Sequence, residues 1–339
     1  MSYQAEYIWI DGTVPSPLMR CKTRIVDSGK EPGTWGFDGS STNQAPGSNS
    51  DCVLEPVFVC PDPIRGEDNV LVLCDVLLPD GTPHATNTRA ACAAVAGEYA
   101  DQESLFGIEQ EYTFMQNGRP LGWPEVGFPA PQGPYYCGVG GGKMVGRQII
   151  EAHTIACLKA GLSIEGTNAE VMMAQWEFQI GVLSAPRIGD EIWMGRWLLY
   201  RIAEDYDVEV TLAAKPVPGD WNGAGAHTNF STNATRESYE ALIVACEALG
   251  KDPVKHVENY GVGIKDRLTG AHETAHWSSF SYGSSDRGAS VRIPWAVEKA
   301  KKGWLEDRRP NANMDPYVVT RLLMETCCGA LADPAQVAV

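Results

Sequence analysis

The residues from Phe106 to Phe114 read FGIEQEYTF, and this stretch decides the fold. In a β-strand, successive side chains point to opposite faces of the sheet, so Glu109 and Glu111 share one face. The alternate positions are mainly apolar, as expected for the covered face of a sheet. The stretch therefore predicts a strand with a buried back and two carboxylates on its front.

Four further stretches repeat this pattern of an apolar back and a polar front. An ordinary solvated sheet face is the alternative for each strand alone, but such faces are rich in Lys, and these hold none. Together they predict a sheet whose front carries carboxylate, imidazole, amide and guanidinium groups. The front residues are Glu177 and Gln179 in 174–181, His227, Asn229 and Ser231 in 226–231, Ser290 and Arg292 in 287–293, and Glu306 and Arg308 in 304–308.

The acidic residues of these strands, with Glu170 and one His, predict a metal site. One imidazole among several carboxylates suits Mg²⁺ or Mn²⁺ better than a structural Zn²⁺. Four Arg residues add planar donors for carboxylates and phosphates. Divalent metals with several Arg residues are typical of phosphoryl transfer. The candidate ligands are Glu109, Glu111, Glu170, Glu177, His227 and Glu306, and the Arg residues are Arg267, Arg287, Arg292 and Arg308.

The chain divides into a small strand-rich part and a larger mixed part. Short strands are expected over 7–10, 19–26, 53–60 and 69–78, with a hairpin signal at Asp11-Gly12 and a polar Gly/Ser-rich loop over 37–51. Residues Pro79–Pro83 close this unit, so we expect domains at 1–83 and 84–339. Helices are expected over 88–100, 143–160, an amphipathic 190–206, 236–249, and from Asp315-Pro316 onward.

Composition limits the kinds of partner. The 339 residues include 27 Lys and Arg against 43 Asp and Glu, a net charge of −16, which argues against a nucleic-acid partner. There is no signal-peptide pattern at the start and no apolar run long enough to span a bilayer. Ten scattered Cys without a C-x-x-C pair suggest reduced thiols and a cytoplasmic protein.

Two motifs point elsewhere and are weighed against their context. Gly138–Lys143 looks like a phosphate loop, but Met144 stands where Ser or Thr must bind Mg²⁺. His272–His276 reads HETAH, the pattern of zinc proteases, which needs a long helix to bring both His to one face. Gly270 precedes the motif, and the segment 277–283 that follows it has a low helix propensity. The zinc protease interpretation is therefore disfavoured.

The motifs taken together resemble the glutamine synthetase family, in matches that run in family order from residue 37 to 310. The short length resembles the type II, eukaryote-like class. The motifs are FDGSST (37–42), GSNSD (47–51), EQEY (109–112), GPYYCGVG (133–140), GTNAEV (166–171), QWEFQIG (175–181), WNGAGAHTNFS (221–231), RLTG (267–270), HET (272–274) and EDRRP (306–310).

The resemblance implies a fold and a reaction. The fold is α+β: a small N-terminal β-grasp domain and a larger catalytic domain with a curved antiparallel sheet backed by helices. The reaction joins NH₄⁺ to the γ-carboxylate of L-glutamate with ATP, through γ-glutamyl phosphate, to give L-glutamine, ADP and phosphate. Partners are therefore L-glutamate, ammonium and ATP, with two or more Mg²⁺ or Mn²⁺ ions per site.

The resemblance also implies roles by position. Glu111, Glu170 and Glu177 would hold the metal near glutamate, while Glu109, His227 and Glu306 would hold the metal on the ATP phosphates. Arg267, Arg308, Asn222 and Gly223 would bind glutamate. Arg287 and Arg292 would contact phosphate, and Asn229, Ser231 and Trp304 would line the nucleotide pocket. Glu273 would close over the intermediate as a lid.

Asp38 resembles the aspartate that binds ammonium and accepts its proton. In the family this residue serves the neighbouring subunit's site, in decamers of two five-membered rings. Asp286, Trp295 and 184–187 depart from the family pattern, which affects details of the nucleotide loops. Two further alternatives are a ligase that uses an amine in place of ammonia, and a non-catalytic relative used for assembly.

Overall fold

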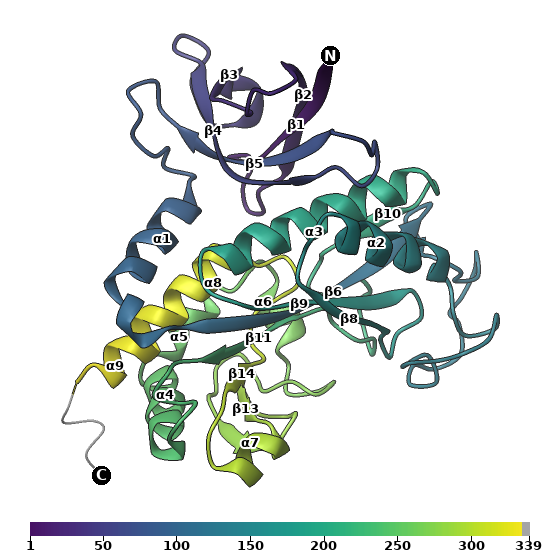
Figure 1. Cartoon of the computed structure of the whole chain (residues 1–339). Coiled ribbons are helices and arrows are strands. Elements are labelled where there is room, and N and C mark those ends of the chain that lie inside the picture. Colours follow the sequence, from purple (N-terminus) through teal and green to yellow (C-terminus); the bar gives the residue numbers. More distant parts are fainter. Residues whose placement is uncertain (334–339) are drawn as a thin grey trace.

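A computed structural model describes residues 1–333, and its N-terminal part is a five-stranded sheet (Figure 1). The strand order is β2-β1-β5-β4-β3, with β1 and β5 parallel and the other pairs antiparallel. The hairpin expected at Asp11-Gly12 forms, since β1 pairs with β2 along its whole length. The strands are β1 (Ser2–Ile10), β2 (Met19–Asp27), β3 (Trp35–Asp38), β4 (Asp51–Pro61) and β5 (Val70–Leu77).

A second, nine-stranded sheet contains all five strands with polar fronts. Its main path runs β12-β13-β14-β11-β6-β9-β8, and β7 and β10 pair with β6. The pairs are antiparallel except β12 with β13, which is parallel, so the expected antiparallel sheet is in fact mixed at one edge. Its strands are β6 (Leu105–Gln116), β7 (Arg119–Pro120), β8 (Ile164–Ala169), β9 (Gln175–Leu183), β10 (Glu209–Thr211), β11 (Ala226–Ser231), β12 (Tyr282–Ser284), β13 (Val291–Ile293) and β14 (Leu305–Asp307).

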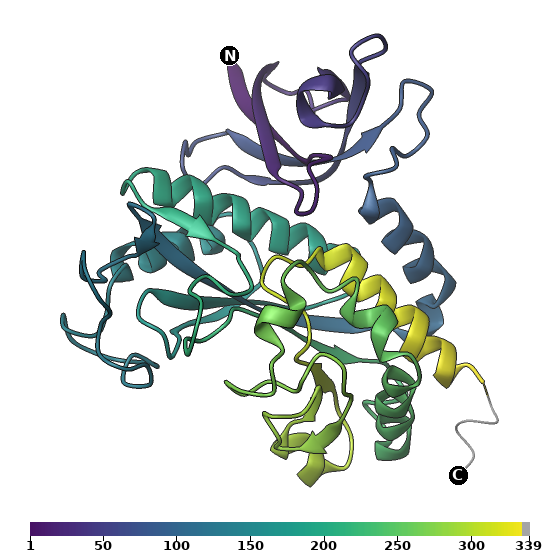
Figure 2. The same ribbon diagram turned by 180° about the vertical axis from the view of Figure 1, so that it is seen from behind.

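Helices complete the α+β architecture, and those nearest the sheets form a layer between them. In Figures 1 and 2, α2 and α3 lie on the face of the second sheet that looks toward the first sheet. The α-helices are α1 (Thr88–Glu98), α2 (Arg147–Lys159), α3 (Arg187–Glu204), α4 (Tyr239–Lys251), α5 (Pro253–Val257), α6 (Ile264–Arg267), α7 (Trp295–Ala300), α8 (Pro316–Leu323) and α9 (Gly329–Leu331). The 3₁₀ turns η1 (Gly39–Thr42) and η2 (Ala100–Gln102) and the π-helix η3 (Met324–Cys328) join them.

Helix α3 differs from the amphipathic helix expected over 190–206, because it is buried on nearly every side. Ile8 and Phe58 of the first sheet belong to the same core as Ile192 and Trp197 of α3, so the outer face of the helix is covered as well. Asp190 is buried, and its carboxylate accepts a hydrogen bond from Nε of Arg89 at 2.7 Å. The sequence shows the polar residues but not their partners, which come from distant segments.

The second sheet has the predicted two faces. On β6, Ile108 and Tyr112 are fully buried against the helical layer, and Gln110 accepts two hydrogen bonds from the buried Arg196 of α3. Glu109 and Glu111 point to the other face. All ten cysteines are free, and no helix within residues 1–333 is long and apolar enough to cross a membrane.

Candidate active site

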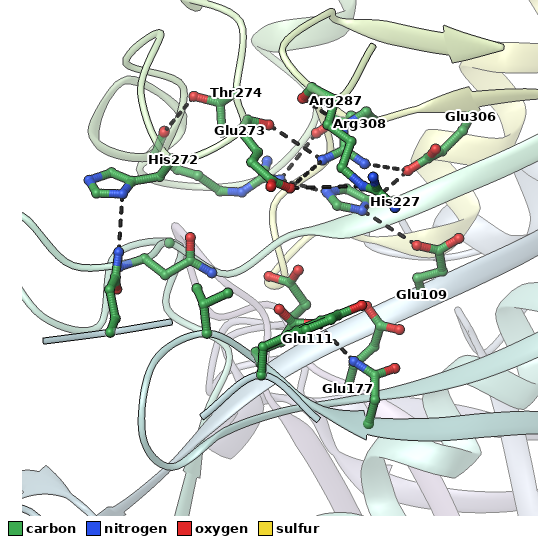
Figure 3. A pocket seen from close by; sticks show the side chains of 18 of the residues that line it. Glu109, Glu111, Glu177, His227, His272, Glu273, Thr274, Arg287, Glu306 and Arg308 are labelled. Carbon is green, nitrogen blue, oxygen red and sulfur yellow. Dashed lines mark hydrogen bonds and ion pairs between the residues drawn. The ribbon is translucent and has the colours of Figure 1, made fainter. Parts of the chain in front are cut away.

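A cavity of about 630 Å³ lies over the polar front of the second sheet (Figure 3). Its lining comes from six adjacent strands of that sheet, β13, β14, β11, β6, β9 and β8, and from the segments that connect them, so it draws on residues spread over two hundred positions. Thirteen of the predicted site residues line it: Glu109, Glu111, Glu170, Glu177, Asn222, Gly223, His227, Arg267, Glu273, Arg287, Arg292, Glu306 and Arg308.

Three carboxylates form one cluster in this cavity. Glu111 on β6 and Glu177 on β9 face each other in the antiparallel register, and Glu170 follows the end of β8. One oxygen from each lies within 4.8 Å of the others. Side-chain amides orient two of them: Gln179 donates to Glu177 at 2.7 Å and Asn168 donates to Glu170 at 2.9 Å.

The first cluster is electrostatically strained without a cation. Burial, and then the charge of Glu170, raises the pKa of Glu111. Burial, and then Glu109 and Glu111, raises the pKa of Glu177 to about 9. Buried like charges favour protonation unless an opposite charge sits between them. Oxygen ligands alone, at these separations, fit a hard divalent cation such as Mg²⁺ or Mn²⁺.

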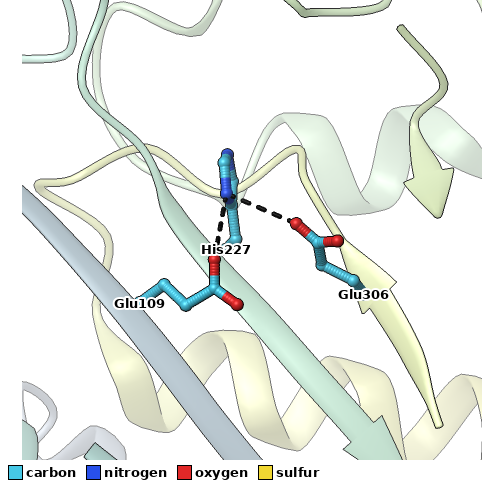
Figure 4. Close-up of side chains that lie close together, drawn as sticks. All are labelled: Glu109, His227 and Glu306. Atoms are coloured by element: carbon cyan, nitrogen blue, oxygen red, sulfur yellow. Dashed lines mark ion pairs between the residues drawn. The ribbon is translucent and has the colours of Figure 1, made fainter. Parts of the chain in front are cut away.

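A second cluster, shown in Figure 4, combines His227 with two carboxylates. Nδ1 of His227 lies 3.5 Å from an oxygen of Glu109, the cross-strand neighbour of this histidine on β6. The same nitrogen lies 3.5 Å from an oxygen of Glu306 on β14. Burial, and then the nearby Arg308, holds the pKa of His227 well below its usual range. The imidazole is therefore neutral, which is the form that binds metals, and the donor set fits a second divalent cation.

The Arg residues of the cavity already have partners in this structure. Arg292 contacts one oxygen of Glu306 at 2.7 Å, and Arg308 contacts the other at 2.6 Å. Arg287 is half-exposed at the rim. The two pairs place guanidinium groups beside the second cluster, where they can meet an anionic ligand.

Arg267 is buried and held from all sides. It ends α6, and its terminal nitrogens contact the carbonyl oxygens of residues 308, 309 and 310 and Nε2 of His227, all between 3.1 and 3.2 Å. Burial lowers its pKa to about 10. Glycine is favoured beside it, because a Cβ at Gly223 would lie 2.8 Å from the backbone oxygen of Ala214 and 2.8 Å from Cγ of Arg267.

The loop after α6 forms one wall of the cavity. His272 and Glu273 both have left-handed backbones, with φ of 52° and 58°, a conformation that costs a non-glycine residue about 1–3 kcal/mol. Glu273 Oε2 lies 4.0 Å from both Arg287 and Arg308. The zinc protease interpretation is wrong here: residues 272–276 are not helical, and His276 turns outward to Ser278.

Four predicted residues do not line the cavity. Asn229 donates to Glu109 at 2.8 Å and so supports the second cluster from the same face of the sheet. Ser231 accepts a hydrogen bond from Arg236, and Trp304 is partly exposed before β14. Asp38 caps η1 in the first sheet, where its carboxylate accepts hydrogen bonds from Ser40 and Ser41.

The structure adds three residues that the sequence alone did not single out as functional. Gln132 accepts the backbone N–H of Asn222 at 2.8 Å. Gln175 donates to the carbonyl of Gly223 at 2.7 Å and to Glu111 at 3.3 Å. Tyr136 also lines the cavity. Gln175 and Tyr136 lie inside quoted motifs, but uncharged side chains give no periodic or electrostatic signal that would mark them.

Comparison with known proteins covers both sheets. Residues 3–79 match the model described as "Glutamine synthetase, beta-Grasp domain", and residues 104–244 match "Glutamine synthetase, catalytic domain". The chain is 75% identical over 332 residues to "Glutamine synthetase" of Frankia alni, covering 98% of this chain and 94% of that protein.

Eukaryotic relatives are similar over nearly the same length. "Glutamine synthetase 2 cytoplasmic" of Drosophila melanogaster is 51% identical over 336 residues, 96% of this chain and 90% of the relative. "Glutamine synthetase, chloroplastic" of Chlamydomonas reinhardtii is 50% identical over 341 residues, 95% of this chain and 90% of the relative.

Proposed function

The chain belongs to the glutamine synthetase family, in its type II, eukaryote-like class, and from that membership we propose how its residues join ammonia to L-glutamate. The enzyme couples this ligation to ATP and yields L-glutamine, ADP and phosphate. The observation that carries the residue assignments is the pairing, in one cavity, of two metal-binding clusters with four Arg residues.

The chemistry explains why both clusters are needed. A carboxylate is a poor acceptor for ammonia, so the γ-carboxylate of glutamate first attacks the γ-phosphorus of ATP and ADP leaves. Ammonia then attacks the acyl carbon of γ-glutamyl phosphate, and phosphate leaves. Divalent cations held by Glu111, Glu170 and Glu177 and by Glu109, His227 and Glu306 would neutralise the two anions that must approach each other.

For glutamate we propose Arg308, Arg267, Asn222 and Gly223. Arg308 is placed to meet a carboxylate, since its guanidinium lies between Glu306 and Glu273 at the cavity wall. Arg267 must leave its present partners to do so. His227 can bind a cation through Nδ1 only with its proton on Nε2, where Arg267 now donates, so the two events favour each other.

For ATP we propose phosphate contacts from Arg287 and Arg292, with Arg287 stabilising the transferred group. Both line the cavity on the side of the second cluster. Asn229, Ser231 and Trp304 remain our proposal for the nucleotide pocket. The half-exposed indole of Trp304, just before β14, supports a stacking role outside the cavity itself.

We propose that Asp38 serves the site of an adjacent subunit in a decamer of two five-membered rings. The support is its position: it is exposed on the first sheet and does not line the cavity of its own chain. Hydrogen bonds from Ser40 and then Ser41 lower the pKa of Asp38 to about 2. It therefore stays anionic and suited to hold NH₄⁺, while its basicity in the isolated chain is weak.

We further propose domain limits at 1–83 and 84–339 and a cytoplasmic location. The isolated bridge between Leu77 and Pro83 closes the first sheet at the proposed boundary. The free cysteines fit a reducing compartment, and the Drosophila relative is named cytoplasmic.

The test is phosphate release from ATP in Mg²⁺ buffer, with glutamine measured in the same samples. We expect release only when glutamate and NH₄⁺ are both present. Turnover with a primary amine in preference to NH₄⁺ would identify an amine ligase instead. No release under any pairing of substrates, from chain shown to be folded, would identify a non-catalytic relative.

A further inference from the structure

The two histidines of the HETAH motif differ in one respect: His272 is tied to the cavity and His276 is not. His272 and Glu273 are consecutive residues with left-handed backbones, and their side chains diverge (Figure 3). Glu273 points toward Arg308 and Arg287, while the imidazole of His272 points to the opposite rim. The catalytic scheme above gives the imidazole no task.

Hydrogen bonding fixes how this imidazole is held. Nδ1 lies 3.2 Å from the amide nitrogen of Gln132, and Nε2 lies 3.1 Å from a carboxylate oxygen of Asp220. The backbone N–H of Asn222 can only donate, so the Gln132 atom that it contacts at 2.8 Å is the oxygen. The Gln132 nitrogen therefore donates to Nδ1, and Nε2–H donates to Asp220.

The same contacts lead directly into the glutamate end of the site. Asn222, whose backbone holds Gln132, donates from its side chain to Gln175 at 3.2 Å. Gln175 in turn donates to the carbonyl of Gly223 and to Glu111 of the first cluster. His272 thus joins the loop that carries Glu273 to the segment proposed to bind glutamate.

We propose that His272 is a positioning residue that latches the lid. By accepting a hydrogen bond from Gln132, it fixes the strained turn that holds Glu273 over the reacting carboxylate. This inference rests on the function proposed above. A lid that opens early exposes γ-glutamyl phosphate to water, which yields ADP and phosphate without glutamine.

The experiment measures ADP and glutamine formed by the full-length enzyme with Mg²⁺, glutamate, NH₄⁺ and ATP. We expect one glutamine per ADP for the wild type and several ADP per glutamine for His272→Ala, with the KM for ATP unchanged. Glu273→Ala provides the reference for a lid that cannot close. His276→Ala is the matched control, because this exposed His contacts only its own loop, and it should remain one-to-one.

Two further variants separate a latch from a general loosening of the loop. His272→Asn keeps an acceptor near the position of Nδ1 and tolerates the left-handed backbone, so it should restore coupling close to the wild-type ratio. Gln132→Met removes the same hydrogen bond from the other side. It also removes the acceptor of the Asn222 backbone N–H, so it is assayed at saturating glutamate to offset weaker substrate binding. There it should uncouple to a similar extent, and the double variant should be no worse than Gln132→Met alone.

The outcomes distinguish the two proposals. A wild type that makes no glutamine would contradict the proposed function. If the wild type and His272→Ala both form one glutamine per ADP, the latch is overturned while the proposed function stands. The same follows from equal uncoupling in His272→Ala and His272→Asn, or from additive effects with Gln132→Met. If His272→Ala proves unfolded in thermal denaturation, Gln132→Met decides the question by itself.

Discussion

At the scale of single residues, the first cluster owes its chemistry to carboxylates kept out of water. Glu111 and Glu177 are only 7% and 5% exposed, and their hydrogen-bond partners are neutral amides. Amides orient the carboxylates without neutralising them, so the position of lowest potential is left for a bound cation. The cluster is thus compatible with a divalent cation at the level of each side chain.

Glu111→Gln should therefore remove activity and leave the fold. We expect kcat to fall by about three orders of magnitude or more, because the change removes a charge that faces a dication. The unfolding midpoint without metal should not fall, since the substitution also removes a buried like charge. Turnover assays and Mn²⁺ titration check this, and near-wild-type turnover would refute the ligand assignment.

The same carboxylates predict how stability without metal depends on pH. Glu177 has a folded pKa of about 9 against an ordinary 4.5, so between these values the folded state binds more protons than the unfolded state. Stability should then fall as pH rises from 5 to 9. Saturating Mg²⁺ should flatten that slope because it stabilises the ionised form.

Thermal unfolding in EDTA and in Mg²⁺, across this pH range, is the measurement. Glu177→Gln is the control, and its slope in EDTA should be shallower than that of the wild type. An equal slope in both proteins would assign the effect to the overall charge of −16 rather than to this carboxylate.

At the scale of elements, the short strand β14 and the residue that follows it present Glu306 and Arg308 to the cavity, and the strand needs support from behind. Asp307 lies between them and faces the opposite way, fully buried. Its carboxylate accepts two hydrogen bonds from the guanidinium of Arg309, at 2.6 and 2.8 Å, and one from the hydroxyl of Tyr260 at 2.9 Å. These contacts and the pairing with β11 set the register of the strand.

Asp307→Asn should destabilise the protein by about 3–5 kcal/mol, because it leaves the buried guanidinium of Arg309 without its counter-charge. Urea denaturation monitored by Trp fluorescence gives this value. Glu151→Gln, which alters an exposed charge on α2, should change stability by less than about 0.5 kcal/mol. A similar small effect for Asp307→Asn would show that β14 is held by backbone pairing alone.

At the scale of the whole molecule, α2 and α3 lie between the first sheet and the second sheet (Figures 1 and 2). The cavity is lined by the polar front of the second sheet, on the face opposite to Ile108 and Tyr112, which pack against these helices. Asp38 is on the first sheet, and all the cavity residues follow Leu105 in the chain. This placement is the observation that supports the proposal of Asp38 serving the site of an adjacent subunit.

A mixing experiment tests that proposal. Asp38→Ala and Arg308→Ala should each be nearly inactive, one without the ammonium-binding carboxylate and the other without a glutamate contact. After dissociation and reassembly together, random mixing should complete about one site in four. Recovery near that fraction of wild-type activity supports shared sites. No recovery, with mixed assemblies verified by mass, would mean that each chain builds its own site.

The sequence by itself determined the strands and their two faces, because a period of two fixes which side chains share a side whatever the partner strands are. It also identified candidate site residues, by their charge in the case of Glu109 and by a family motif in the case of Asn222. The two candidate metal-binding clusters consist entirely of residues it singled out, since charged groups on an apolar sheet are conspicuous.

Only the tertiary structure brings these residues together in space. The residue pattern gave the six candidate ligands as one set, and the family resemblance implied two sets of three. The strand order places each set together, and the first sheet buries α3 by packing on its outer face. Folding also hydrogen-bonds Arg267 to backbone carbonyls, and it brings Gln132 into contact with His272, 140 residues away in the chain. Contacts between distant segments leave no local pattern, because hydrogen-bond partners are set by where the chain folds back and not by spacing along it.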